Sequence, residues 1–252
     1  MNFIKQSALP KEGLSIESLM ELLFYREEFL TIASHELKTP LTALKLHAQV
    51  FKRNSIKNTV THYEKKQVDA LVEQMESQAN RMGKLVDAMI DISRIRSNQM
   101  HYLKEPFNLS ETVNSVLKHQ FIEHPLQQFS VKLKENILFI GDKKRIEQVF
   151  SNVLDNAVKY GKKLPIEVKL TQRKETIFFS VTDLGYGISE KDKKRIFNYF
   201  QRAIPASEVS GIGLGLFIAQ EIVQAHGGEI LVKSDIAKGS TFKVVLKKGN
   251  AP

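Results

Sequence analysis

One histidine stands in a setting that suits chemistry on its imidazole ring. His35 lies in residues 29–41, which read FLTIASHELKTPL. Its neighbour Glu36 supplies a carboxylate that can steady one tautomer of the ring. Thr39, four residues further on, places a hydroxyl on the same face of a helix. A lone exposed histidine is more often inert than catalytic, so this one needs a second site that supplies a reaction partner.

A glycine-rich segment far downstream has the composition of a phosphate site. Gly211, Gly213 and Gly215 alternate directly before an apolar helical pattern. Glycines there let backbone N–H groups surround a phosphate at a helix N-terminus. The segment is not a P-loop, because Leu214 and Leu216 stand where a Lys-Ser pair would be. It is not a convincing dinucleotide fingerprint either, because no suitable strand–helix–strand unit surrounds it.

Two further motifs precede these glycines and suit a base and a cation. Asp183, Gly185 and Gly187 follow a predicted strand, where the carboxylate can accept a hydrogen bond from an exocyclic amine and the glycines let the backbone approach a flat base. Asn152 and Asn156 are four residues apart on one predicted helix face, and two amide oxygens there can hold a hard cation. Taken alone, the first motif is equally consistent with a turn and the second with a solvated helix face.

Two long helices are predicted to carry His35. Residues 15–54 contain no glycine and a single proline, and apolar residues recur there every three or four positions. A second helix repeats apolar residues in alternating steps of four and three, as in a coiled coil. An antiparallel pair leaves much of this seam exposed, so we expect two copies to form a dimeric four-helix bundle. The alternative is that the seam packs on the second half of the chain. The seam consists of Val68, Val72, Met75, Ala79, Met82, Val86 and Met89.

Beyond residue 97 the pattern changes to mixed strands and helices. This order predicts an α/β sandwich with helices on one face of a mixed sheet. The polar segment 188–210, which contains Arg202, has the length of a mobile lid. The fold class is therefore multi-domain, with an extension over 1–15, an all-α helical hairpin over 16–98 and an α/β domain over 99–248. Strands are expected at 102–107, 131–134, 137–140, 166–170, 177–182, 229–234 and 241–246, and helices at 108–119, 142–161 and 212–225.

Bulk composition narrows the class of protein further. The 252 residues carry a net charge of +9, which suits nucleic acid, an acidic protein or an anionic membrane surface. No nucleic-acid-binding motif accompanies the charge, so a solvated surface that favours acidic partners is the better interpretation. The absence of cysteine excludes disulfides and thiolate metal sites and fits a reducing cytosol. No apolar run reaches the length of a membrane span.

Together the motifs resemble the catalytic core of a sensor histidine kinase of a two-component system, from about residue 26 to 246. The H-box corresponds to residues 34–40, the N-box to 152–160, the G1 box to 183–187, the F-box to 197–200 and the G2 box to 211–215. The resemblance implies a dimeric phosphoacceptor hairpin joined to a Bergerat-type ATP-binding domain. One departure is Leu184, which stands where the family usually has asparagine.

The resemblance also implies roles for individual residues. His35 would accept the phosphoryl group, Glu36 would activate it, and Thr39 would orient water for phosphate removal from the partner. Asn152 and Asn156 would hold Mg²⁺. The residues expected to bind ATP are Asn152, Asn156, Lys159, Tyr160, Asp183, Gly185, Gly187, Arg202, Gly211, Gly213 and Gly215.

The implied function is ATP-dependent autophosphorylation of His35, followed by phosphoryl transfer to an aspartate of a response regulator. We expect a homodimer, either cytoplasmic or the cytosolic part of a membrane-bound sensor. One alternative is a regulator that mainly dephosphorylates its partner, with Thr39 decisive. Another is a scaffold without turnover, against which the intact His35 and Asp183 argue. Serine kinases of the anti-sigma type share the ATP domain but would not explain the helical hairpin.

Overall fold

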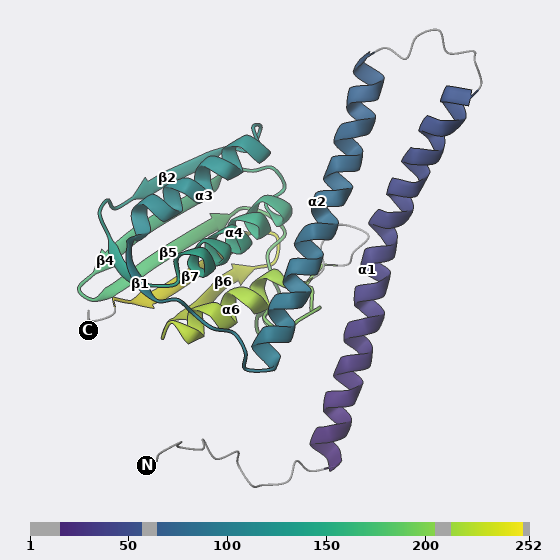
Figure 1. Ribbon diagram of the computed structural model, residues 1–252. Coiled ribbons are helices and arrows are strands. Elements are labelled where there is room, and N and C mark those ends of the chain that lie inside the picture. The colour runs from purple at the N-terminus through teal and green to yellow at the C-terminus, as the bar shows by residue number, and fades with distance from the viewer. Residues whose placement is uncertain (1–15, 57–64, 205–212, 249–252) are drawn as a thin grey trace, which may run out of the picture. The chain divides into compact units, whose positions relative to one another are not determined.

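The computed structural model describes residues 16–56, 65–204 and 213–248 (Figure 1). The chain divides into two compact units between Met82 and Gly83, inside the second long helix. None of the helices in the part described is long and apolar enough to cross a membrane.

The first unit is helical, as expected. Helix α1 (Ile16–Ile56) runs without interruption through Pro40, and α2 (Lys65–Arg96) begins in this unit and continues into the second. The two helices run antiparallel (Figure 1). Seam residues differ in exposure, since Met75 is half-buried whereas Val72 is exposed. The helical hairpin is therefore confirmed, and its pairing with a second copy stays a prediction.

The second unit is built on a five-stranded mixed sheet. Its strand order is β2–β4–β5–β7–β6. Strand β2 pairs parallel with β4, and the other neighbours are antiparallel. A separate two-stranded sheet joins β1 and β3. The strands are β1 (Glu105–Asn108), β2 (Phe129–Leu133), β3 (Leu138–Gly141), β4 (Ile166–Arg173), β5 (Thr176–Asp183), β6 (Glu229–Asp235) and β7 (Gly239–Lys247).

Three helices cover one face of the large sheet (Figure 1). They are α3 (Leu109–Glu123), α4 (Lys143–Tyr160) and α6 (Gly215–Ala225). The Asp142 side chain caps α4 by accepting a hydrogen bond from the Arg145 N–H at 3.1 Å, so the predicted start of this helix is confirmed. The core lies between the helices and the sheet, where the rings of Phe150 on α4 and Phe179 on β5 are 4.3 Å apart.

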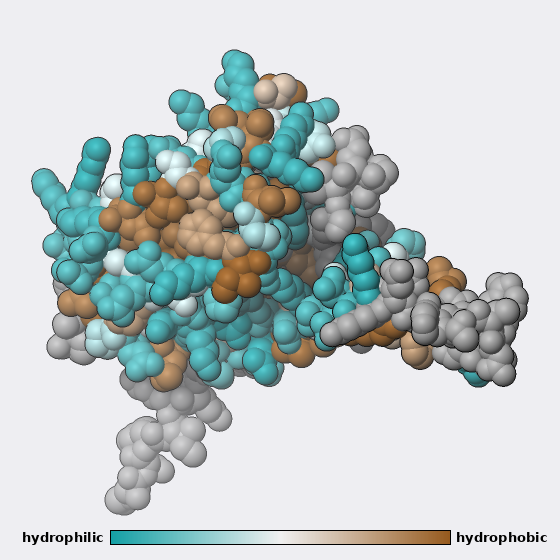
Figure 2. All heavy atoms as spheres, turned by 90° about the horizontal axis from the view of Figure 1, so that it is seen from above, coloured by the Kyte–Doolittle hydropathy of each residue, from teal (hydrophilic) through white to brown (hydrophobic). Residues whose placement is uncertain are grey.

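The α/β sandwich is confirmed, with differences that depend on long-range pairing. Sequence patterns did not predict that β1 and β3 form their own sheet or that β2 lies parallel to β4. The short helix α5 (Asp192–Arg195) was also not predicted. Polar side chains dominate the face of the molecule shown in Figure 2, with islands of apolar ones among them, which agrees with a solvated surface.

Candidate active site

The candidate phosphoacceptor lies on the surface of α1. The side chain of His35 is exposed, as expected for a group that reacts with a nucleotide held elsewhere. The Thr39 hydroxyl donates a hydrogen bond to the His35 backbone carbonyl at 3.2 Å. Glu36 is paired with Arg81 on α2, at 3.4 Å, and no bond joins it to the neighbouring imidazole in this structure. The pair is partly exposed and contributes little stability, so Glu36 can exchange this partner for another.

Asp183 ends strand β5 and lies almost fully buried, with 3% of its surface exposed. Its Oδ1 accepts a hydrogen bond from the Gly185 N–H at 2.9 Å. Burial raises the pKa of this carboxyl, and backbone N–H donors, including those of Gly185 and Ser240, oppose that rise. A buried ionisable group whose pKa is shifted by burial is typical of functional sites, which makes Asp183 a candidate binding residue.

The segment after Asp183 packs tightly against the C-terminal end of α4. A Cβ on Gly185 would lie 1.8 Å from the Tyr160 carbonyl oxygen, so only glycine allows this approach. The same carbonyl accepts a hydrogen bond from the Tyr186 N–H at 3.2 Å, and the Lys162 ammonium lies 4.2 Å from the centre of the Tyr186 ring. The predicted residues Tyr160, Asp183 and Gly185 therefore meet at one place.

Asn152 links α4 to the start of α6. A Cβ on Gly215 would lie 3.2 Å from Asn152 Oδ1, so the two residues are neighbours across the helices. Asn152 Nδ2 is buried and has no hydrogen-bond partner among the residues described. A buried amide donor without a partner costs free energy, and a phosphate oxygen could supply the missing acceptor. Asn156, one turn further along α4, is half-buried, and Lys159 is exposed.

Arg202 and Gly213 lie together close to the start of α6. The Phe200 N–H donates to the Gly213 carbonyl at 3.0 Å, and a Cβ on Gly213 would lie 3.2 Å from Arg202 Cγ. The first G2 glycine, Gly211, lies outside the described residues. The structure thus brings Arg202, Gly213, Gly215 and Asn152 to neighbouring positions around the start of α6.

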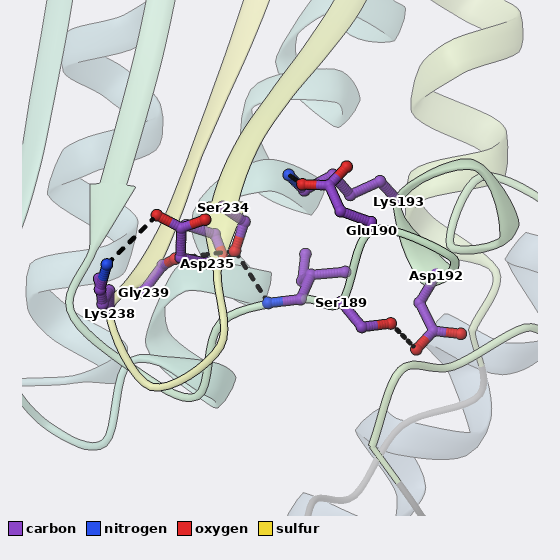
Figure 3. A network of polar contacts seen from close by, with 10 residues as sticks. Ser189, Glu190, Asp192, Lys193, Ser234, Asp235, Lys238 and Gly239 are labelled. Atoms are coloured by element: carbon purple, nitrogen blue, oxygen red, sulfur yellow. Dashed lines mark hydrogen bonds and ion pairs between the residues drawn. The ribbon is translucent and has the colours of Figure 1, made fainter.

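The β6–β7 hairpin packs against the segment that follows Asp183. Sequence patterns did not predict this contact. Ser234 on β6 is buried, and its hydroxyl bonds to Ile188, Gly239 and Ser240. Figure 3 shows Ser234 and Gly239 on this hairpin beside the segment that carries Ser189. The only sequence signal is a serine at an inward position of a strand, which is too common to identify a role.

The second unit also includes the C-terminal part of α2, through contacts that the sequence did not reveal. Asp91 is 6% exposed and accepts hydrogen bonds from Arg145 Nη1 at 2.8 Å and from Gln148 Nε2 at 2.7 Å, both on α4. Near the end of α2, Arg96 Nη2 donates to the Tyr199 hydroxyl of the F-box at 3.1 Å. The last turns of α2 are therefore tied to the α/β fold by a buried ion pair.

The connection after α2 is anchored as well. The Leu103 N–H donates to Asp142 Oδ2 at 3.1 Å, and the Tyr102 and His226 rings meet edge to face. His226 Nε2 accepts a hydrogen bond from the Asp142 N–H, and burial lowers the pKa of this imidazole. His226 is thus held neutral in a structural role.

Two family models match the chain. Residues 25–98 match the His Kinase A (phospho-acceptor) domain. Residues 141–250 match the histidine kinase-, DNA gyrase B- and HSP90-like ATPase domain. The first match contains the candidate phosphoacceptor, and the second contains the motifs that surround α4 and α6.

Similar proteins agree with these matches. The signal transduction histidine-protein kinase ArlS of Staphylococcus aureus is 33% identical over 227 residues, which are 88% of this chain and 49% of ArlS. The chain thus spans about half the length of the curated relatives it matches. The Acinetobacter baumannii histidine kinase AdeS shares the fold, with a TM-score of 0.61 at 24% identity over 86% of this chain and 98% of that structure.

The mycobacterial sensor histidine kinase MprB aligns with a TM-score of 0.52 at 28% identity, over 57% of this chain and 97% of that structure. Two domain matches in the expected order, a relative in sequence and these relatives in structure lead to one conclusion. The chain belongs to the sensor histidine kinase family of two-component systems.

Proposed function

We propose that this protein is an ATP-dependent histidine kinase that phosphorylates its own His35 and passes the phosphoryl group to an aspartate of a response regulator. The observation that carries this proposal is the convergence of three distant segments around α4 and α6. Asp183 and Gly185 meet the end of α4, while Gly215 meets Asn152 on the same helix. The exposed imidazole of His35, within the phospho-acceptor match, supplies the group to be phosphorylated.

Asp183 is suited to hold the adenine end of ATP. A carboxylate offers about four lone-pair positions. Backbone N–H donors, including those of Gly185 and Ser240, take some of them, and we propose that a remaining position accepts from the exocyclic amine. Tyr160 lies at the same end of α4 and can contact the base. The ATPase domain match supports this assignment.

The phosphates fit the start of α6. Backbone N–H groups at a helix N-terminus favour an anion, and the Asn152 side chain offers an unpaired buried donor there. Arg202, beside Gly213, and the exposed Lys159 add positive charge for the phosphates. Gly187 and Gly211 complete the set of proposed nucleotide-binding residues.

Mg²⁺ is proposed to arrive with the nucleotide rather than to occupy a protein cage. No cluster of three or more His, Cys, Asp or Glu side chains suitable for a metal occurs among the residues described. Mg²⁺ commonly keeps its waters and binds through one or two protein oxygens plus phosphates, so Asn156 and Asn152 are a sufficient set. The ion would offset negative charge on the phosphates as the phosphoryl group moves.

His35 acts as the nucleophile in the proposed reaction. A neutral imidazole nitrogen forms a bond to the γ-phosphorus, the bond from that phosphorus to the β–γ bridging oxygen breaks, and ADP leaves. Once the Glu36 carboxylate has left Arg81, it accepts the proton of the other ring nitrogen or stabilises the positive charge on the ring. The phosphoryl group then passes from His35 to the carboxylate of the regulator, which regenerates the imidazole.

The assembly proposed for this reaction is a homodimer. Apolar side chains on α1 and α2, including Leu41, Leu46 and Val72, are exposed in the single chain, which supports a covering partner helix. We retain the domain limits 16–98 and 99–248. For a hinge near residues 97–101 to let the ATP domain approach His35, the contacts of Asp91 and Arg96 with that domain must first open. The net charge of +9 suits an acidic regulator surface.

The test is incorporation of γ-labelled phosphate from Mg-ATP into the native protein and into His35→Gln. Acid-labile, alkali-stable label that is absent from the variant is the expected result. Label that persists in His35→Gln would mean that another residue is the acceptor. A native protein without label would favour the phosphatase or scaffold alternatives.

Thr39→Ala is expected to keep autophosphorylation and to slow the loss of phosphate from the regulator.

A further inference from the structure

We propose that Ser234 is a positioning residue for nucleotide binding, which holds the segment after Asp183 in the shape that receives the base. This inference rests on the proposed function, because it concerns the same site. Ser234 does not belong to any of the nucleotide-binding motifs, and it acts through the backbone of Ile188 rather than through the ligand.

The Ser234 hydroxyl uses its whole hydrogen-bonding capacity inside the protein. It donates to the Gly239 carbonyl at 2.7 Å and accepts from the Ile188 N–H at 2.8 Å. Ser240 Oγ lies 3.0 Å away, and because the single Ser234 proton is given to Gly239, Ser240 is the donor of that bond. One buried oxygen therefore joins strand β6, the start of β7 and the segment after the G1 box.

The backbone around this hydroxyl leaves little room for another arrangement. Gly187 has a φ of +70°, and a Cβ there would lie 1.9 Å from the Asp235 carbonyl oxygen. The Ala237 N–H donates to the Tyr186 carbonyl at 2.7 Å. Gly239 is equally close to the other end of the segment, since a Cβ there would lie 2.0 Å from the Asp183 carbonyl oxygen. Residues of the β6–β7 turn thus contact the segment 183–188 at both of its ends.

Loss of the hydroxyl would therefore act on the ligand site. Without Ser234 Oγ, the buried Ile188 N–H and Gly239 carbonyl lose their partner, and the chain must move to find water or other donors. The backbone on either side of Gly187 would shift with it. The base end of the site is affected, while the phosphate end at α6 is held by other contacts.

Ser110 provides a matched control in the same unit. The residue is 4% exposed, compared with 5% for Ser234. It likewise joins a backbone carbonyl to a backbone N–H, donating to Lys134 at 2.8 Å and accepting from Ile137 at 3.1 Å. Ser110→Ala removes the same kind of bonds from α3 without touching the segment after Asp183.

The experiment measures the dissociation constants of ADP and of inorganic tripolyphosphate for the full chain and for both serine variants. Ser234→Ala should weaken ADP roughly tenfold, the effect of misplacing a hydrogen bond to a charged group, and leave tripolyphosphate within about twofold. Ser110→Ala should leave both dissociation constants unchanged. It should lower the urea midpoint of unfolding by about as much as Ser234→Ala does. Ser234→Cys, which keeps the volume but bonds weakly, should give a smaller loss for ADP and none for tripolyphosphate.

Three results would overturn the inference. These are native ADP affinity in both Ser234 variants, an equal loss for ADP and tripolyphosphate, and an equal loss in Ser110→Ala. Failure of the native protein to bind ADP would instead overturn the proposed function itself, so the two failures are distinguishable.

Discussion

At the scale of single residues, the buried Asp183 carboxylate is expected to lower stability and to serve the proposed nucleotide binding. Burial raises the pKa of this group, so keeping it ionised in the folded protein costs free energy at neutral pH. The Gly185 N–H only partly offsets this cost. Such a penalty is tolerated where a ligand later uses the charge.

Asp183→Asn is therefore expected to weaken ADP binding at least tenfold and to leave the nucleotide-free protein as stable as the native one or more stable. Because the folded pKa is raised, the native protein loses stability as pH rises from the unfolded-state pKa through the folded one, and the variant does not. The gain should thus be largest at pH 7 and vanish toward pH 3. Urea unfolding at several pH values measures the difference in free energy of unfolding between the variant and the native protein. A difference that favours the variant less at pH 7 than at pH 3 would contradict the prediction.

At the scale of elements, the C-terminal part of α2 behaves as part of the α/β unit. The ion pair between Asp91 and Arg145 is buried, and Gln148 completes it. Removing one partner of such a pair leaves an uncompensated buried charge. This costs much more stability than removing one partner of an exposed pair.

Asp91→Ala is accordingly expected to lower the free energy of unfolding of the α/β unit by about 3 kcal/mol. Asp87 lies one turn earlier on α2 and is exposed, so Asp87→Ala is a matched control that should change stability by less than about 0.5 kcal/mol. Urea denaturation followed by circular dichroism compares the two. Equal effects would mean that the buried pair does not couple α2 to α4.

At the scale of the whole molecule, part of the seam of the helical unit is exposed in the single chain. Val72 is 46% exposed, although its place in the heptad pattern predicts burial. A second copy of the chain, which would bring the same seam, can cover it.

Native protein is thus expected to sediment at about twice the chain mass of 28.7 kDa. Val72→Glu should weaken the dimer at least tenfold, because it would bury a charge in the seam. The nearby exposed Glu76 gives the control Glu76→Lys, which should remain dimeric. Analytical ultracentrifugation over a range of concentrations decides, and a monomeric native protein would overturn the proposed assembly.

Sequence patterns by themselves determined the elements and the order of the motifs. Helix α4 begins after Asp142 and ends before Gly161, as its cap residues predict, and β4 pairs with β5 as the alternation of apolar residues indicates. These features depend on neighbours within a few positions, so local propensity and periodicity suffice. The family motifs likewise named the candidate site residues, although their roles stay predictions.

Only the tertiary structure decided which side chains meet. Ser234 bonds to the backbone of a residue 46 positions away, and Asp91 pairs with one 54 positions away, so no local pattern records either contact. The partner of Glu36 was equally hidden, since Arg81 lies on another helix. Long-range pairing depends on how the apolar faces of all elements pack together. Local periodicity shows that a face exists and does not show what covers it.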